Sequence, residues 1–420
     1  MRSVNAAIFA LFKALAFLLL LATAAGPAAA QSTPPWVEVA PSEALSVRVV
    51  VPPTTDCPTV SADGGAYAML PRALPDAAFP VRVCEARVPE SVARLSIGDV
   101  PLPALPATVN RIVVIGDTGC RLARYAVQDC DDPRAWPFAA IARAAAAKRP
   151  DLVIHVGDYY YRETACPTDR PGCAGSPFGD NWPAWRADFL DPAAPLLAVA
   201  PWVMVRGNHE LCDRGGQGWF RLLDPYPGRA DCVDSTPPYR LSVGGLNLLV
   251  FDSSDANDLL APPATVALYA GQLAPLLAQA PAGSWLLLHH PVWALAPPGI
   301  LGGFSTNQTM QAAIRGLIPP SLDVVLSGHV HDFIAYDFGP ERPAQLIVGT
   351  GGDRLENRVQ TEIAGAELDG ITVRDGIAIE RFGYMVLDRN PAGGWDGVLY
   401  APDDTVLARC RIAGRSLGCR

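Results

Sequence analysis

The sequence predicts an α/β protein, with a layered β-sheet core flanked by helices and a small β-rich domain before it. From residue 111 onward, short apolar runs typical of buried strands alternate with helical stretches. Between residues 36 and 108, strand-like runs alternate with proline-rich turns and no long helical period occurs. The 420 residues are 50% hydrophobic and 18% charged, which excludes an intrinsically disordered protein and allows a large buried core.

The elements follow in a clear order along the chain. Leu45–Val51 is strand-like, and a linker near residues 101–106 ends the β-rich part. Strand Ile112–Ile115, helix Pro133–Lys148 and strand Leu152–Val156 then form a βαβ unit. Further predicted strands are Trp202–Val205, Leu246–Phe251, Trp285–Leu288, Asp323–Leu326, Leu346–Val348, Tyr384–Leu387, Gly397–Tyr400 and Thr405–Arg409, with helices at Pro263–Gln279 and Gln308–Leu317. We therefore expect a leader (1–30), a β-rich N-terminal domain (31–108) and an α/β domain (109–420).

The charge distribution bears on the class of partner. The formal net charge is −9, only two of the 33 basic residues are lysines, and no basic run or stripe occurs. Such a chain offers no long-range attraction for polyanions, so we expect no binding of nucleic acid. The 41 prolines and 37 glycines show no period, which excludes collagen-like and repeat architectures.

Residues 1–30 are typical of a secretory signal peptide. Arg2 and Lys13 give a positive start, and Ala14–Ala25 is an uncharged, mostly apolar run of 12 residues. Ala28–Ala30 provides small residues for cleavage before Gln31. A helix of that length rises about 18 Å, which is too short for a bilayer core of about 30 Å. We expect an exported protein, periplasmic or secreted and not stably inserted in a membrane; an uncleaved anchor is the alternative.

The cysteines agree with export. All ten follow residue 30, and an even number in an exported chain predicts a disulfide framework. No Cys-x-x-Cys pair occurs, which argues against a zinc ribbon or a thioredoxin-type site. The sequence leaves the pairing open, but neighbours along the chain form short loops. The expected pairs are Cys57–Cys84, Cys120–Cys130, Cys166–Cys173, Cys212–Cys232 and Cys410–Cys419; free buried thiols are the alternative.

Five predicted strands are each followed by Asp, Asn or His within three residues. In open α/β sheets ligands bind at the carboxyl ends of strands, because the loops there converge. A glycine usually precedes the polar residue and allows a sharp turn with room for an ion. The segments are Gly116–Gly119, Gly157–Tyr161, Gly207–Glu210, His289–Pro291 and Gly328–His331, and all six histidines lie in or beside them.

The residue types in these segments favour a metal site. Two aspartates, a tyrosine, an asparagine and several histidines include too many oxygen donors for a structural zinc, and no thiolate. A bridging carboxylate with two groups of nitrogen and oxygen ligands suits a pair of ions about 3.5–4 Å apart. Such a pair can activate a bound hydroxide and clamp a phosphoryl group from both sides.

The ordered segments closely resemble the motifs of calcineurin-like metallophosphoesterases and, within them, of purple acid phosphatases. The family motifs GDxG, GDxxY, GNH(D/E), VxxH and GHxH are matched in order between Asp117 and His331. The resemblance covers roughly residues 110–405, including Val348–Gly352. Leu286 replaces the valine of the fourth motif, which leaves the ligand position His289 intact. The N-terminal region is not covered, although purple phosphatases of the plant type also carry an N-terminal β-sandwich.

The resemblance implies a calcineurin-like fold and a centre of two metal ions. By position, one group of side chains would hold Fe(III), a second group would hold Fe(II), Zn(II) or Mn(II), and one carboxylate would bridge. The Fe(III) ligands would be Asp117, Tyr161 and His331, the bridge Asp158, and the second-site ligands Asn208, His289 and His329.

The remaining polar residues carry several interpretations. His209 matches the family position that contacts the substrate phosphate and protonates or orients the leaving group. Glu210 either assists catalysis or orients His209, and Tyr161 is either a ligand or an aromatic cap on its loop. His155 lies inside a strand and is interpreted as a hydrogen-bonded core residue, and His290 as a neighbour of the ligands at the pocket rim.

The sequence therefore predicts an exported binuclear-metal phosphoesterase, acid phosphatase-like, that hydrolyses small phosphate monoesters. The expected partner is a small phosphorylated substrate, with Arg206 or His290 as rim contacts for its phosphate. A phosphodiesterase of the same superfamily is the first alternative. A non-catalytic, metal-stabilised binding protein of the cell envelope is the second, and the intact ligand set together with His209 argues against it.

Overall fold

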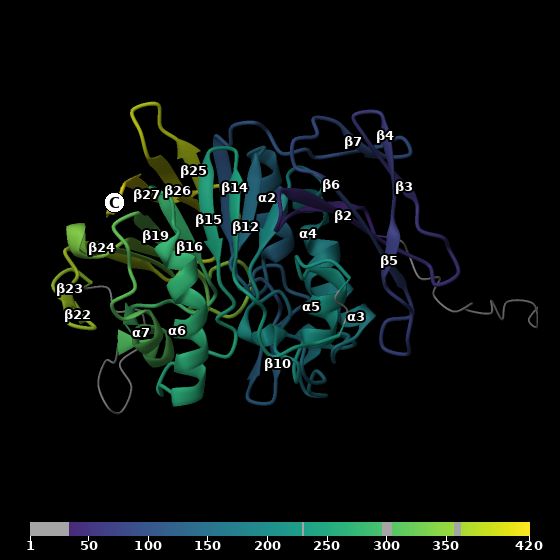
Figure 1. The fold of residues 1–420 in the computed structure, drawn as a ribbon. Helices are drawn as coiled ribbons and strands as arrows, with labels where there is room; N and C mark the ends of the chain where they lie inside the picture. The colour runs from purple at the N-terminus through teal and green to yellow at the C-terminus, as the bar shows by residue number, and fades with distance from the viewer. Residues whose placement is uncertain (1–32, 229–230, 296–304, 357–362) are drawn as a thin grey trace, which may run out of the picture. The chain divides into compact units, whose positions relative to one another are not determined.

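Two stacked β-sheets with helices on their outer sides form the framework of the structure (Figure 1), a computed structural model. It describes residues 33–228, 231–295, 305–356 and 363–420. The expected signal peptide, residues 1–30, lies outside the described residues. Among the described helices, none combines the length and the apolar composition that a membrane span requires.

The larger sheet has 11 strands and contains both ends of the described chain. Its middle strands β9, β12 and β13 run parallel, so their carboxyl ends meet at one edge. In spatial order the strands are β28 (Ser416–Cys419), β27 (Val406–Ala413), β26 (Trp395–Tyr400), β25 (Tyr384–Arg389), β9 (Arg111–Ile115), β12 (Leu152–His155), β13 (Trp202–Met204), β1 (Trp36–Ala40), β2 (Ala44–Val51), β6 (Arg82–Pro89) and β5 (Leu70–Ala73).

The second sheet has seven strands, and four neighbouring ones, β15, β16, β19 and β21, are parallel. Their carboxyl ends form the second edge from which polar loops emerge. In spatial order the strands are β14 (Tyr239–Val243), β15 (Leu246–Val250), β16 (Ser284–Leu287), β19 (Leu322–Ser327), β21 (Ala344–Val348), β20 (Phe333–Asp337) and β24 (Asp375–Ile379).

The main core lies between the two sheets. Aliphatic residues from β9 and β12, such as Val114 and Ile154, belong to one buried cluster with Leu248, Leu287 and Leu326 of the second sheet. Alternate residues of the second sheet point the other way, into a cluster with α6 and α7. The helices are α2 (Phe138–Ala147), α3 (Trp182–Trp185), α4 (Asp191–Leu197), α5 (Gly216–Leu222), α6 (Pro263–Ala278) and α7 (Gln308–Ile314).

The predicted fold class is confirmed, and most predicted strands agree with the structure to within a few residues. The largest difference is the helix expected at Pro133–Lys148, which begins only at Phe138. Before it, Asp132 accepts backbone hydrogen bonds from Ala135 and Trp136, and Pro137 then occupies the N-cap position. Proline fits at a helix start because it has no N–H to donate, so the chain forms a turn first and the helix afterwards.

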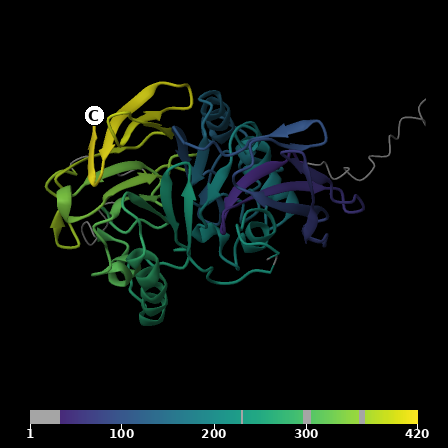
Figure 2. The same ribbon diagram turned by 45° about the horizontal axis from the view of Figure 1, so that its top comes forward.

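Strands on both sides of the expected boundary at residue 108 belong to one sheet. Strand β1 pairs in parallel with β13 through Glu38 and Trp202, and β2, β6 and β5 extend the same sheet outward (Figure 2). A separate four-stranded sheet also lies within residues 31–108. Its strands, in spatial order, are β4 (Gly65–Ala68), β3 (Thr59–Ala62), β7 (Leu95–Ile97) and β8 (Val100–Leu102).

Two buried arginines join this N-terminal part to the end of helix α5. The Arg48 guanidinium donates to the backbone carbonyls of Leu222 (2.5 Å) and Asp224 (2.6 Å). Arg72 donates to the carbonyls of Phe220 and Asp224, at 2.9 and 2.8 Å. Carbonyls at the end of a helix have no hydrogen-bond partner within the helix and carry partial negative charge. The two guanidinium groups provide both the missing hydrogen-bond donors and a compensating positive charge.

All five expected disulfides are present in the described structure: Cys57–Cys84, Cys120–Cys130, Cys166–Cys173, Cys212–Cys232 and Cys410–Cys419. The structural setting differs between the pairs. Cys120–Cys130 and Cys166–Cys173 each close a short segment, Cys57–Cys84 joins the loop before β3 to strand β6, and the segment between Cys212 and Cys232 contains helix α5. Cys410 and Cys419 face each other across the β27–β28 pair.

Candidate metal centre

The five sequence motifs meet in space. Asp117 follows β9, Asp158 follows β12, Asn208 follows β13, and the histidine motifs follow β16 and β19. Ligand atoms of Asp117, Asp158 and His289 all lie within 4.8 Å of one another, and all three residues are buried. The two sheets therefore bring their carboxyl-end loops to one place, as the positions of the motifs predict.

Tyr161 lies at the centre of the first group of donors. Its hydroxyl is 3.1 Å from Asp117 Oδ1, 2.7 Å from Asp158 Oδ2 and 3.0 Å from His331 Nε2. A single O–H can donate to only one of the two carboxylate oxygens, so the Asp117 and Asp158 carboxylates compete for one proton. A buried cluster of this kind is balanced best by a cation, which supports the ligand interpretation of Tyr161 over that of a simple aromatic cap.

The second group of donors surrounds the Asn208 side chain. Its Oδ1 atom lies 3.0 Å from His289 Nε2 and 3.2 Å from His329 Nδ1. His289 Nε2 is also 3.2 Å from Asp158 Oδ2, so the Asp158 carboxylate is adjacent to both groups. This is the arrangement expected for a bridging ligand.

The backbone is strained at three of the candidate ligands. Asp117, Asp158 and His329 have φ angles of 57°, 59° and 70°, in the left-handed region. Such conformations cost on the order of 1–3 kcal/mol each for a residue other than glycine, and they concentrate at functional sites. Here each strained residue turns its side chain or backbone into the cluster; the His329 amide, for instance, donates to both Asp117 carboxylate oxygens at 3.1 Å.

Two motif glycines allow this close approach. Gly157 has φ +102°, and a Cβ atom there would overlap the His289 ring. A Cβ on Gly207 would overlap the carboxylate and the backbone nitrogen of Asp158. The glycines are therefore required because the candidate ligands occupy the space that any side chain would need.

The pKa values in the centre show a demand for positive charge. Burial alone would raise the pKa of the Asp158 carboxyl, but His289 and His209 outweigh burial and hold it well below its ordinary value. Burial would lower the pKa of His331, yet Asp353 and Asp117 raise it to about 9. A metal cation among these carboxylates would meet the same demand.

His209 borders the centre and has two charged neighbours. Its Nδ1 atom lies 2.9 Å from Glu163 Oε1, and its Nε2 atom lies 3.9 Å from Asp158 Oδ2. The Arg214 guanidinium donates to the same Glu163 oxygen at 2.6 Å and lies 2.7 Å from His209 Nε2. Glu163 and Arg214, which belong to none of the five motifs, are thus the charged neighbours of His209.

Glu210 faces away from the donors. Its carboxylate accepts hydrogen bonds from the backbone amides of Asp158 (3.0 Å), Tyr159 (2.8 Å), Tyr160 (3.3 Å) and Gly207 (2.9 Å). Of the two roles considered for it, this geometry favours orientation: Glu210 holds the loop that carries Asp158 and the turn that carries His209.

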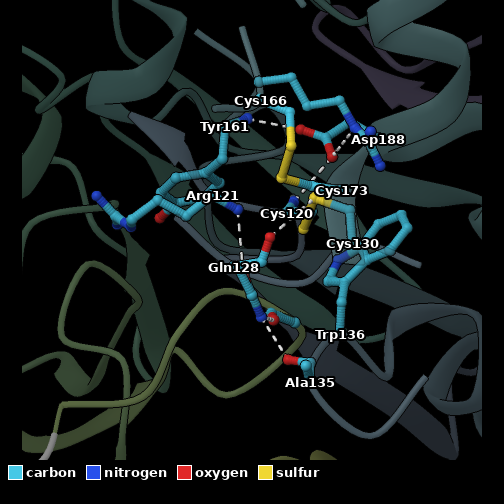
Figure 3. Close-up of a disulfide and its surroundings, with 12 residues drawn as sticks. Cys120, Arg121, Gln128, Cys130, Ala135, Trp136, Tyr161, Cys166, Cys173 and Asp188 are labelled. Atoms are coloured by element: carbon cyan, nitrogen blue, oxygen red, sulfur yellow. Dashed lines mark hydrogen bonds and ion pairs between the residues drawn. A yellow bond between two sulfur atoms is a disulfide. The ribbon is translucent and has the colours of Figure 1, made fainter. Parts of the chain in front are cut away.

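A disulfide and a buried carboxylate brace the loops of the first two motifs (Figure 3). Asp188 accepts from the backbone amides of Cys120 (2.8 Å) and Tyr161 (2.6 Å) and pairs with Arg162 at 2.8 Å. The Cys120–Cys130 bond closes the loop that follows Asp117. The Tyr161 backbone is thus tied to the disulfide-bonded loop before any metal binds.

The expectations for His155, Arg206 and His290 have different outcomes. His155 lies in β12, where its Nε2 is 3.0 Å from Thr118 Oγ1 and its ring stacks on Tyr159, as expected of a core residue. The expectation that Arg206 contacts substrate at the rim was wrong. Its guanidinium is buried and bonded to Glu210 O (3.0 Å) and the Asp252 carboxylate (3.2 Å). His290 is also buried, with its ring 4.0 Å from that of His329.

The donor set fits a pair of metal ions. Carboxylates, a phenol and an amide oxygen suit hard cations, and imidazoles suit iron, zinc or manganese. The donors form two groups that share one carboxylate, which is the ligand pattern of two-metal sites that clamp a phosphoryl group. Fold and donor set together define a metal-dependent phosphoesterase.

Comparison with known proteins gives the family. The model of the calcineurin-like phosphoesterase family matches residues 110–333, and the chain belongs to this family. No curated protein matches the sequence. Among solved structures, the chain is similar to the purple acid phosphatase PPD1 from yellow lupin (Lupinus luteus) seeds, with a TM-score of 0.57 and 13% identity over 92% of this chain and 74% of that one. It is also similar to PhoD, with a TM-score of 0.54 and 13% identity over 91% of this chain and 90% of that one.

Proposed function

We propose that the protein is an exported, acid phosphatase-like enzyme that hydrolyses small phosphate monoesters with Fe(III) and a divalent ion of iron, zinc or manganese. The observation that carries the proposal is the Tyr161 hydroxyl, which lies within 3.1 Å of Asp117, Asp158 and His331. A phenolate is a hard, anionic oxygen donor, and together with two carboxylates it favours a trivalent ion.

Residues of the chain beside the donors can orient the substrate and its leaving oxygen. The bound ions would supply an activated water and positive charge at phosphorus. His209 contacts Glu163 through Nδ1, and its Nε2 lies 2.7 Å from the Arg214 guanidinium and 3.9 Å from Asp158 Oδ2, at the border of the centre. His209 and Arg214 together can therefore contact the phosphate and orient the leaving oxygen. Arg214 is paired with Glu163 at 2.6 Å, so it contributes hydrogen-bond donors on this side of the centre and no unpaired charge.

The cavity beside the first donor group supports a small substrate. Its volume is about 280 Å³, and His331 forms part of its wall. Arg354 and Arg121 contribute positive groups and Tyr125 an aromatic one, although Arg121 is paired with Asp353 and Glu356 adds a carboxylate to the same wall. With a net charge of −9 and two lysines in the whole chain, this positive charge is local and does not attract a long polyanion.

The deciding experiment compares substrates and measures metals in the same preparation. We expect kcat/KM for an aryl phosphomonoester to exceed that for the bis-aryl diester and for an oligonucleotide, with an acidic optimum. Elemental analysis should find two ions per chain, one of them iron. Preference for the diester at alkaline pH would favour the phosphodiesterase, and bound metal without turnover would favour a binding protein.

Three variants test the residue roles. His209→Ala should lose on the order of 10²–10⁴ in turnover with nearly unchanged metal content, because His209 is not placed among the ligands. Asp158→Asn should deplete both ions, since a neutral amide bridges poorly. Tyr161→Phe should bleach the violet colour expected of Fe(III) tyrosinate. Equal metal loss in the His209 and Asp158 variants would contradict these roles, and a colourless, fully active protein with two zinc or manganese ions would overturn the iron assignment alone.

Export is supported by the five disulfides, which are typical of oxidising compartments. If residues 1–30 are a cleaved signal peptide, N-terminal sequencing of the mature protein should begin at Gln31. A mature chain that still begins at Met1 would favour the uncleaved anchor.

A further inference from the structure

A sixth strand end contributes to the centre, although it carries no family motif. Strand β15 ends at Val250, and the chain then runs through residues 251–262 before helix α6 begins at Pro263 (Figure 1). This loop supports the histidine motif of β16: Ser253 Oγ accepts from the backbone amides of His289 (3.1 Å) and His290 (3.0 Å). It also brings one carboxylate, Asp258, to the ring of a candidate ligand.

Asp258 contacts His329 on the side opposite the donor cluster. Its Oδ2 lies 2.8 Å from His329 Nε2. The other ring nitrogen, Nδ1, lies 3.2 Å from Asn208 Oδ1 within the second donor group. A neutral imidazole has one N–H, and a carboxylate at Nε2 attracts that proton to Nε2. Nδ1 is then left with its lone pair directed at the second site.

The Asp258 carboxylate is itself held in place. Its Oδ1 accepts from Asn307 Nδ2 at 2.9 Å, and its backbone carbonyl accepts from the Gln308 amide at 3.1 Å. Thr309 Oγ1 accepts from the neighbouring Asn257 amide at 3.1 Å and donates to Leu260 O at 2.8 Å. The start of helix α7 therefore fixes the loop on both sides of Asp258.

The other two histidine ligands are oriented by different groups. His289 Nδ1 lies 2.8 Å from the backbone carbonyl of Val156, and His331 Nδ1 lies 2.9 Å from that of Arg354. Asp353 lies near His331 as well, at 3.2 Å, but it also pairs with Arg121. Among the described residues, Asp258 has no arginine or lysine partner in an ion pair, so its full charge acts on His329.

From this geometry we propose that Asp258 is a positioning residue of the second metal site: it fixes the tautomer and ring orientation of His329 and so raises the affinity of that site for its divalent ion. The inference rests on the proposed binuclear function. Carboxylates behind metal-bound histidines typically change metal affinity by 10- to 100-fold. The effect should be confined to one of the two ions, because Asp258 contacts a ligand of the second site only.

The test measures metal retention in the full mature chain. Purified wild type, Asp258→Asn and Asp258→Ala are dialysed against increasing concentrations of a chelator, and the metal that remains is determined by elemental analysis. Asp255→Asn is the matched control, since it removes an exposed carboxylate three residues away in the same loop. Thermal unfolding of each variant shows whether the fold is retained. If the alanine variant is unfolded, the comparison uses Asp258→Asn, whose side chain has nearly the same shape as that of aspartate.

We expect Asp258→Ala to lose one equivalent of metal at a chelator concentration 10- to 100-fold lower than wild type, with Asp258→Asn in between and Asp255→Asn unchanged. The second equivalent should remain bound in all four proteins. Unchanged metal retention in both Asp258 variants, or simultaneous loss of both ions from Asp258→Asn, would overturn the inference about Asp258. The proposed function would still stand in that case, provided that the wild type binds two ions. A wild type that binds fewer than two ions would overturn both.

Discussion

The buried carboxyl of Glu38 should make the stability of the protein fall as the pH rises toward neutrality. Glu38 lies in β1, fully buried, where its Oε1 accepts from Trp36 Nε1 (2.8 Å) and Arg48 Nη1 (3.0 Å). Its Oε2 has no hydrogen-bond partner among the residues that the structure describes. Burial raises its pKa, and although Arg48 and Trp36 act in the opposite direction, the result is a pKa of about 7 against an ordinary value of 4.5.

The sign and size of the effect follow from this pKa. Between pH 4.5 and pH 7 the folded chain keeps the Glu38 proton that the unfolded chain has released. The contribution to stability is therefore complete below about pH 4.5 and is lost as the pH rises through about 7. Because one pKa unit corresponds to about 1.4 kcal/mol, the loss amounts to about 3 kcal/mol in the free energy of unfolding.

Glu38→Gln removes this titration while it keeps the acceptor for Trp36 and Arg48. Urea unfolding of both proteins in chelator, from about pH 4.5 to about pH 8, should show the variant gaining about 3 kcal/mol relative to wild type across that range. The comparison cancels the titration of groups that do not interact with Glu38. If Arg48 instead keeps Glu38 ionised throughout, the variant would be less stable at neutral pH and the difference would shrink in acid, and the reasoning would be refuted.

Two further perturbations test the loops of the centre. Gly207→Ala places a methyl group against Asp158, so it should release metal and lower the free energy of unfolding by about 1–3 kcal/mol through overpacking. The control is Gly271→Ala, in open space within helix α6, which should raise the free energy of unfolding by about 0.5–1 kcal/mol and leave metal content unchanged. Wild-type metal content in the Gly207 variant would contradict the packing argument. Replacing Cys120 and Cys130 together with alanine opens a loop of 10 residues and should cost about 3 kcal/mol in urea unfolding, and a cost below about 1 kcal/mol would show that the bond does not constrain the unfolded chain.

Much of the centre could be predicted because a simple rule connects it to sequence. Polar residues just after buried parallel strands must lie at one edge of a sheet, and Asp117, Asp158 and Asn208 do. The same rule does not predict the position of Asp258, because Asp258 follows its strand by eight residues. Its position depends instead on contacts with the start of helix α7, which lies far along the chain.

Glu210 shows a second limit of sequence reasoning. Its place beside His209 is compatible with catalysis or with a structural role. The two residues lie in one 3-10 turn, Asn208–Glu210, and the turn directs the Glu210 carboxylate back onto backbone amides. That direction depends on where the Asp158 loop lies in space, which a local pattern does not contain.

The parallel pairing of β1 with β13 has a consequence for how the chain can be divided. A fragment that began at residue 109 would retain all five motifs, yet β13 would become an edge strand, with its unpaired N–H and C=O groups open to other chains. The carbonyls at the end of helix α5 would also lose Arg48 and Arg72. Such a fragment would be prone to aggregate. The N-terminal strands therefore protect the edge of the sheet that carries the first three motifs, and engineered versions of this protein should keep them.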